Sequence, residues 1–250
     1  MDTSITSVRI KIIYLVIFSI AMGFLESAVV VYLRQIYYPD GFTFPLRFMA
    51  LEEISIEYLR EGSTIVMLIS LSIIAGRNFY ERLSFFLLCF GIWDIFYYVW
   101  LKVLLNWPPS FLTWDILFLI PVVWAGPVLA PIISATTMVI ISGCILSFQQ
   151  KGYPVRIKFL EWGLLFSGAF LIFITFIWDY SKIIIQTGFI SRLLILRTNP
   201  YFQKIIAHYV PTDYQWLLFM AGESLILCFL VIFIRRTTAY KIFCPEKHSQ

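Results

Sequence analysis

Residues 91–100 read GIWDIFYYVW, and Asp94 is the charged residue in this stretch of apolar and aromatic side chains. The stretch lies inside a longer apolar segment, 83–105. Its length matches the ~20 residues that an α-helix needs to cross a bilayer. The dipeptide Trp-Asp returns at Trp114-Asp115 and Trp178-Asp179. The segment therefore predicts a transmembrane helix with a carboxylate at membrane depth.

The composition of the whole chain agrees with a lipid-embedded protein. Of its 250 residues, 60% are hydrophobic and 14% are charged, and the mean hydropathy is +0.84. A soluble domain is typically ~25% charged. No polar linker divides the chain, so we predict one polytopic membrane domain over 1–250 with the lipid bilayer as its surroundings. The net charge of +4 comes from short runs at predicted helix ends, and we expect no nucleic-acid partner.

Six apolar segments are long enough to span the membrane. They are 12–36, 56–76, 83–105, 127–148, 160–182 and 214–234. The first resembles a signal peptide, but no small-residue cleavage site follows it, which favours an uncleaved helix. Residues 111–124 are too few to cross and precede Pro127 and Pro131, so they predict a short re-entrant or interfacial half-helix. The predicted fold class is an all-α integral membrane protein with six transmembrane helices and this half-helix.

Lysines and arginines gather on one side of the predicted helices. They are Arg9, Lys11, Arg77, Arg82, Lys151, Arg156, Lys158, Arg235, Arg236, Lys241 and Lys247. Cytoplasmic loops carry an excess of such residues. We therefore expect a multi-pass protein of the inner (plasma) membrane with both termini in the cytoplasm. The opposite 185–212 loop departs from the rule with Arg192, Arg197 and Lys204, and residues 199–211 within it are expected to form an interfacial helix.

The acidic residues of the spans share one layer. Along helices of about 1.5 Å rise, Asp94 lies about 18 Å beyond Arg82 and Glu223 about 18 Å before Arg235. Both positions are near the middle of a ~30 Å hydrocarbon core. An ionised carboxylate there costs at least ~2.5–3.5 kcal/mol, so we expect these groups to turn inward to a shared cavity. The candidate ion- or ligand-binding residues are Glu26, Glu57, Arg60, Glu61, Asp94, Tyr97, Tyr98, Asp115, Asp179 and Glu223.

A purely structural role for these acids stays open. Arg34, Arg60 and Lys102 fall in the same layer and could hold them in ion pairs. Seven acids against three bases leave some without a basic partner, which favours protonation, a bound cation or a ligand. The aromatic residues of the layer fit interfacial anchors, or the walls of a pocket for an amphipathic ligand.

No motif assigns a catalytic residue, so the sequence does not decide whether the protein is an enzyme. His208 and His248 both lie outside the predicted spans, and haem is not expected. We predict no cofactor. If a metal binds, a set of carboxylates suits a hard divalent cation such as Mg²⁺, Ca²⁺ or Mn²⁺. The oligomeric state does not follow from the sequence.

Three stretches of the sequence resemble the same protein family. Residues 90–131, FGIWDIFYYVWLKVLLNWPPSFLTWDILFLIPVVWAGPVLAP, resemble a signature of an uncharacterised family of bacterial polytopic inner-membrane proteins. GFLESAVVVYLR (23–34) and EYLREGSTIVML (57–68) are similar to the same family, so the resemblance covers residues 20–131. It implies a bacterial membrane protein and brings no activity with it.

Three functions remain as hypotheses. A cation- or proton-coupled carrier or ligand-binding membrane protein, taking a small ion or a lipid-like ligand, comes first. Three spans followed by three place the second half upside down, as in inverted-repeat transporters. The alternatives are an intramembrane enzyme acting on a lipid or isoprenoid, and a non-catalytic membrane assembly factor.

Overall fold

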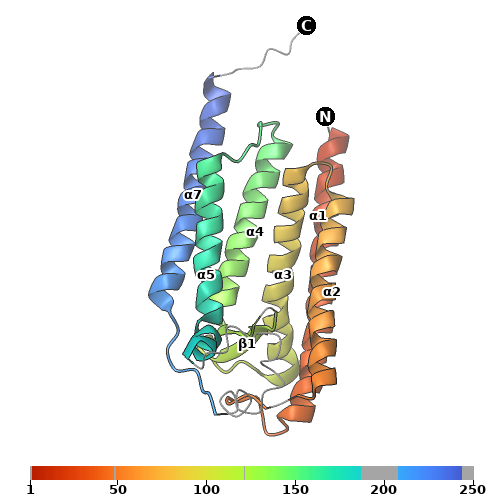
Figure 1. Cartoon of the computed structure of the whole chain (residues 1–250). Coiled ribbons are helices and arrows are strands. Elements are labelled where there is room, and N and C mark those ends of the chain that lie inside the picture. Colours follow the sequence, from red (N-terminus) through yellow and green to blue (C-terminus); the bar gives the residue numbers. More distant parts are fainter. Residues whose placement is uncertain (1, 48, 121, 187–207, 244–250) are drawn as a thin grey trace.

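The chain forms a bundle of six long helices that run alternately up and down (Figure 1). The computed structural model describes residues 2–47, 49–120, 122–186 and 208–243. The helices are α1 (Asp2–Tyr37), α2 (Leu51–Ala75), α3 (Phe79–Leu105), α4 (Leu129–Gln150), α5 (Phe159–Gln186) and α7 (Trp216–Phe243). Each is long and apolar enough to cross a membrane. The chain is a six-span, all-α membrane protein, which confirms the predicted class and its six transmembrane helices.

The half-helix predicted over 111–124 is wrong. This stretch holds strand β1 (Trp114–Phe118), which pairs antiparallel with β2 (Trp124–Pro127), and Asp115 lies opposite Gly126. The apolar and aromatic residues of β1 suit a strand as well as a helix when the segment is this short. Backbone polar groups at membrane depth must find partners inside the protein. The hairpin meets this need by pairing its two strands within the bundle.

Local sequence explains where α3 begins and ends. Its N-cap Asn78 accepts a hydrogen bond from the Glu81 amide at 3.0 Å. Gly76 makes the tight turn from α2 possible, because a Cβ there would lie 2.6 Å from a side-chain carbon of Arg82. Asn106 ends the helix in the left-handed conformation, with φ of 52°, which asparagine tolerates better than most residues. α3 is thereby held as one uninterrupted span.

Two of the hydrophobic cores formed by the described residues lie in opposite halves of the bundle. The first core lies among α1, α2 and α3 and is joined by Leu146 of α4; it contains Leu15, Met22, Leu68, Phe85, Cys89 and Trp93. The second lies among α4, α5 and α7 and contains Ile141, Ile172, Phe176, Phe219, Ile226 and Phe229. In the second half Gly168 meets Gly222, where a Cβ would lie 2.6 Å from the Gly222 carbonyl oxygen. The halves join along α3 and α4, which pack closely on each other.

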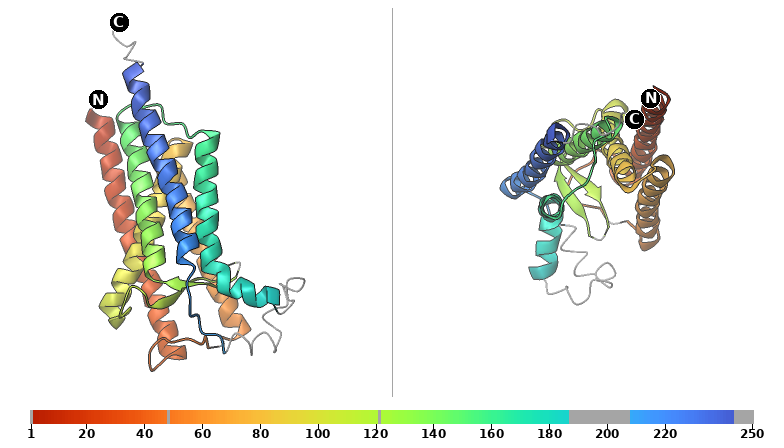
Figure 2. Two further views of the ribbon diagram at one scale, coloured as in Figure 1. Left: turned by 90° about the vertical axis from the view of Figure 1, so that its left-hand side faces the viewer. Right: turned by 90° about the horizontal axis from the view of Figure 1, so that it is seen from above.

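The helices form a curved row rather than a closed ring. Seen along the bundle, α2 and α5 stand apart at the two free edges of the row, with the hairpin between them (Figure 2, right). α2 packs on α3, whereas α5 packs on α7 and β2. α1 starts and α7 ends at one end of the bundle, called here the terminal end, and the hairpin lies toward the other, the hairpin end (Figure 1). The bundle therefore has one open side, between α2 and α5.

One prediction concerns residues that the structure leaves largely undescribed. Most of the interfacial helix expected over 199–211, namely residues 199–207, lies outside the described residues. Residues 208–211 are described and are not helical.

Candidate functional site

A cavity of about 1100 Å³ occupies the space between the two halves of the bundle. All six helices and the hairpin contribute to its lining. Phe79 and Phe166 belong to this lining yet are 60% and 65% exposed, so they form its rim. Phe79 begins α3 at the terminal end, and Phe166 lies on α5, at a free edge of the row, so the cavity reaches the surface of the bundle at these places. The opening at Phe166 is called here the mouth of the cavity.

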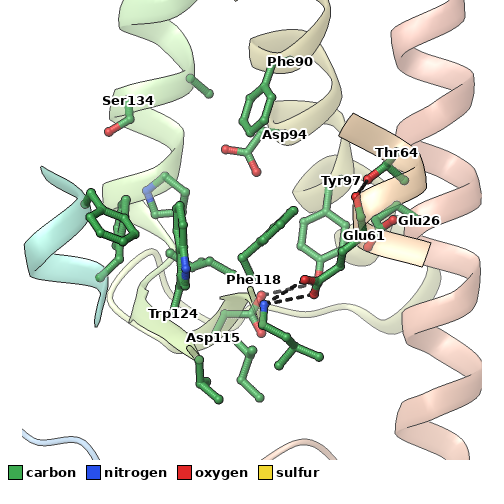
Figure 3. Close-up of a pocket in the computed structure, with 18 of the residues that line it drawn as sticks. Glu26, Glu61, Thr64, Phe90, Asp94, Tyr97, Asp115, Phe118, Trp124 and Ser134 are labelled. Carbon is green, nitrogen blue, oxygen red and sulfur yellow. Dashed lines mark hydrogen bonds between the residues drawn. The ribbon is translucent and has the colours of Figure 1, made fainter. Parts of the chain in front are cut away.

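The cavity has an apolar half and a half in which charged residues stand among apolar ones, called here the charged half. Toward the terminal end the lining residues include Leu83, Leu87, Phe90, Leu165, Ala169, Ile172 and Phe173. The charged lining residues all lie toward the hairpin end: Glu26, Arg34, Arg47, Glu57, Arg60, Glu61, Asp94, Asp115 and Glu223. Figure 3 shows this change, with Phe90 above Asp94, and with Glu61 and Asp115 below. The cavity is thus amphipathic along the bundle axis.

Arg60 is the centre of an ion-pair group on α2. It pairs with Glu26 of α1, and its Nη2 lies 2.7 Å from Glu57 Oε2 one turn earlier on α2. The i, i+3 spacing of Glu57 and Arg60 predicts this second contact, since residues three apart share a helix face. One arginine therefore balances two carboxylates, and α1 is tied to α2.

Arg34 and Asp115 form a second, more deeply buried pair. Arg34 Nη2 lies 3.1 Å from Asp115 Oδ1, and Asp115 is 2% exposed. The guanidinium also lies 3.8 Å from the ring centroid of Trp107. The hydroxyls of Tyr97 and Tyr98 donate to the Asp115 carboxylate, Tyr97 at 3.5 Å. Burial raises the pKa of Asp115 to about 6, while the positive charge of Arg34 acts in the opposite direction.

Glu61 ties the hairpin to α2. Both of its carboxylate oxygens accept from the Leu119 amide, at 3.0 and 3.1 Å (Figure 3). Leu119 follows β1 directly, in the connection to β2. The hairpin is therefore fastened to α1 through Asp115 and to α2 through Glu61, and it packs on α5 through Trp124 and Phe173, whose ring centroids are 5.0 Å apart.

Glu223 is held by hydroxyl groups. It is 4% exposed and accepts from Ser134 Oγ at 3.1 Å and from Thr137 Oγ1 at 2.9 Å. Ser134 and Thr137 are one turn apart on α4 and face α7. Sequence reasoning missed this pair, although two hydroxyl residues at i, i+3 in an apolar helix are a usable signal.

Asp94 stands apart from these arrangements. Its carboxylate points into the cavity (Figure 3). Within the described part of the chain, it has neither a hydrogen bond nor an ion pair, because Arg34 and Arg60 bind other acids. The negative charges of Asp115 and Glu26 repel a negative charge on Asp94. Asp94 is thus a cavity carboxylate without a protein partner among the described residues.

Nine of the ten predicted site residues line this cavity, and Asp179 does not. Asp179 is half-buried and bonds to Tyr209 instead. The ion pairs left open by the sequence exist for Arg34 and Arg60. Lys102 instead donates to the carbonyls of Asn106 and Pro108, at 3.3 and 3.1 Å. Across the described ranges, no three His, Cys, Asp or Glu residues are grouped closely enough to hold a metal ion.

Comparisons with known proteins add nothing to this geometry: no family model matches the chain, and neither the curated proteins nor the solved structures contain a significant match.

Proposed function

We propose that this protein takes an amphipathic, lipid-like molecule from the bilayer and holds it in the cavity between its two halves. The observation that supports this function is that one cavity, lined by all six helices, is apolar toward the terminal end and carries all of its charged residues toward the hairpin end. The apolar chain would lie among the residues toward the terminal end. The polar end would lie among the carboxylates and arginines toward the hairpin.

The two halves would contribute differently to binding. Moving an acyl chain from lipid into an apolar cavity gains little, because both environments are hydrocarbon. Selection among membrane amphiphiles therefore depends on the polar end, where Asp94, Glu61 and Arg34 line the cavity. A polar group held there, away from water, contributes strongly only if its charge and hydrogen bonds are matched.

We further propose the inner membrane of a bacterium, with both termini cytoplasmic. The support is the run of lysines and arginines at the terminal end and the family resemblance of residues 20–131. In this orientation the charged half of the cavity belongs to the outer half of the bilayer. The polar end of the ligand would then be drawn from the outer leaflet.

The test is the lipid retained by the purified protein. Ala169 lines the cavity near its mouth on α5, and Ala169→Trp should narrow it. Ile74 is 82% exposed on α2 and does not line the cavity, so Ile74→Trp is the control. After mild extraction, mass spectrometry should find an amphiphile enriched over bulk lipid with the parent and with Ile74→Trp, and depleted with Ala169→Trp. Equal retention by all three proteins would contradict the proposal.

A proton- or cation-coupled carrier is the second candidate, and Asp94 favours it. A cavity carboxylate without a partner can take up and release a proton or a cation, and Glu223 lines the same cavity from the other half. Proteoliposomes should then show coupled cation or proton uptake that Asp94→Asn abolishes. Flux that is unchanged by this substitution would remove the carrier from consideration.

A further inference from the structure

The charges of the cavity do not balance. Its hairpin end holds six carboxylates and three arginines. Arg60 binds Glu26 and Glu57, and Arg34 binds Asp115. The third arginine, Arg47, is exposed and its guanidinium lies 5.6 Å from the ring centroid of Tyr38.

The remaining carboxylates differ in what holds them. The Leu119 amide binds Glu61, and two hydroxyls bind Glu223. Asp94 has no such group among the described residues, and its carboxylate faces open space in the cavity (Figure 3). A carboxylate at membrane depth is costly when it is ionised and unpaired. A positive charge brought by the occupant of the cavity would remove this cost.

The walls around Asp94 are aromatic. Phe90 lies one turn before it and Tyr97 one turn after it on α3, so their side chains share its helix face. From the hairpin, Phe118 and Trp124 line the same cavity, with ring centroids 5.6 Å apart (Figure 3). Aromatic faces attract organic ammonium groups. A hard metal ion would instead require about six or more oxygen ligands.

On the basis of the proposed function, we infer that the polar end of the ligand is a cationic ammonium group that binds beside Asp94 within these rings. The apolar chain then extends past Phe90 toward the terminal end, where the lining is apolar. The ligand class is a single-chain or lipid-like organic amine, including quaternary amines. Glu26 and Glu57 stay bound to Arg60 in this arrangement and add negative potential without contacting the ligand.

The experiment compares three amphiphiles of one chain length: dodecyltrimethylammonium, neutral dodecanol and anionic dodecyl sulfate. Binding is followed by tryptophan fluorescence with the full chain in nanodiscs of zwitterionic lipid, and partition into empty discs is subtracted. The ammonium compound should bind about tenfold or more tightly than dodecanol, and dodecyl sulfate most weakly. Asp94→Asn should abolish this preference, because it removes the charge that distinguishes an ammonium group from a hydroxyl. Asp40→Asn, an exposed change of the same charge near the hairpin end, should keep the preference.

The outcomes separate the inference from the function on which it depends. If dodecanol and dodecyl sulfate bind as well as the ammonium compound, the cavity accepts amphiphiles but the inferred head group is wrong. Competition by Na⁺, Mg²⁺ or protons without ammonium preference would mean that Asp94 holds an inorganic cation or a proton. Preference that survives Asp94→Asn would place the head group elsewhere. No binding of any amphiphile would overturn the proposed function itself.

Discussion

The two walls of the cavity stabilise their buried polar groups in different ways. The wall from α1, α2 and α3 carries ion pairs centred on Arg60 and Arg34, together with Asp94, which has no ion-pair partner in the described ranges. The wall from α4, α5 and α7 is mostly apolar, and its acid among the described lining residues, Glu223, is held by two hydroxyls. In both halves the third helix packs on the first and the second. Three helices therefore form a charged wall in one half and a nearly apolar wall in the other.

The difference predicts which substitutions each wall tolerates. Removing one partner of a buried ion pair leaves an uncompensated charge, whereas removing a charge from a hydroxyl-bound acid leaves groups that can rearrange. Stability should accordingly be most sensitive to arginine loss on the charged wall. It should be least sensitive at Asp94, which has no protein partner to lose among the described residues.

The largest effect is expected for Arg60→Met. Glu26 and Glu57 would both lose their cation, at a cost of about 3 kcal/mol in the free energy of unfolding. Reversible unfolding in mixed micelles measures this cost. Arg47→Met is the matched control, because Arg47 is exposed and contacts a ring rather than an acid. Equal effects of the two substitutions would show that the Arg60 pairs contribute no special stability.

A smaller effect is expected in the apolar half for Gly168→Ala. The added Cβ would lie 2.6 Å from the Gly222 carbonyl oxygen and from Ile226, so α5 and α7 must move apart. We expect this to lower the free energy of unfolding by about 2 kcal/mol. Gly163→Ala on the same helix meets nothing within 4 Å. The control should be stabilising by up to about 1 kcal/mol, because alanine favours a helix over glycine. Reversible unfolding in mixed micelles measures both variants. If Gly168→Ala leaves the free energy of unfolding unchanged, the close crossing of α5 and α7 is not needed for stability.

Glu223→Gln should lower the free energy of unfolding by less than about 1 kcal/mol. The hydroxyls of Ser134 and Thr137 can rotate, so one donates to the new amide oxygen and the other accepts from its nitrogen. Glu223→Leu removes both contacts and leaves the hydroxyls of Ser134 and Thr137 without that partner. It should therefore be clearly less stable than the glutamine variant. If both variants are equally unstable, the charge of Glu223 itself matters to folding.

The smallest effect on stability is expected for Asp94→Asn, which should leave the melting temperature unchanged or raise it. No hydrogen bond or ion pair of the described residues is lost, and repulsion from Asp115 and Glu26 is removed. Sites that hold strained or like-charged groups for function are often stabilised when the group is neutralised. A clear drop in melting temperature would assign Asp94 a structural role.

The lengths of the apolar segments predicted much of this fold, whereas part of the candidate site could not be predicted from the sequence. Six segments of sufficient length predicted six spans, and depth counted along the helices predicted the shared layer of Asp94 and Glu223. The hairpin escaped prediction because residues 111–124 are short, and periodicity does not separate a strand from a helix at that length. The pair of Arg34 with Asp115 joins residues 81 positions apart. Such a contact depends on how α1 meets the hairpin, which one sequence does not contain. For the same reason the sequence did not show that Asp179 turns to Tyr209 rather than to the cavity.

The cavity holds a selected amphiphile rather than bulk lipid if the proposed function is correct. Photocrosslinking from two positions tests this claim directly. Phe90 lines the apolar half of the cavity, whereas Phe18 is exposed on α1 outside it. A benzophenone amino acid at either position, irradiated in native membranes, captures whatever lies against it, and mass spectrometry identifies the adduct. We predict one enriched amphiphile at Phe90 and the ordinary phospholipid mixture at Phe18. The same mixture at both positions, or no adduct at Phe90, would contradict the claim.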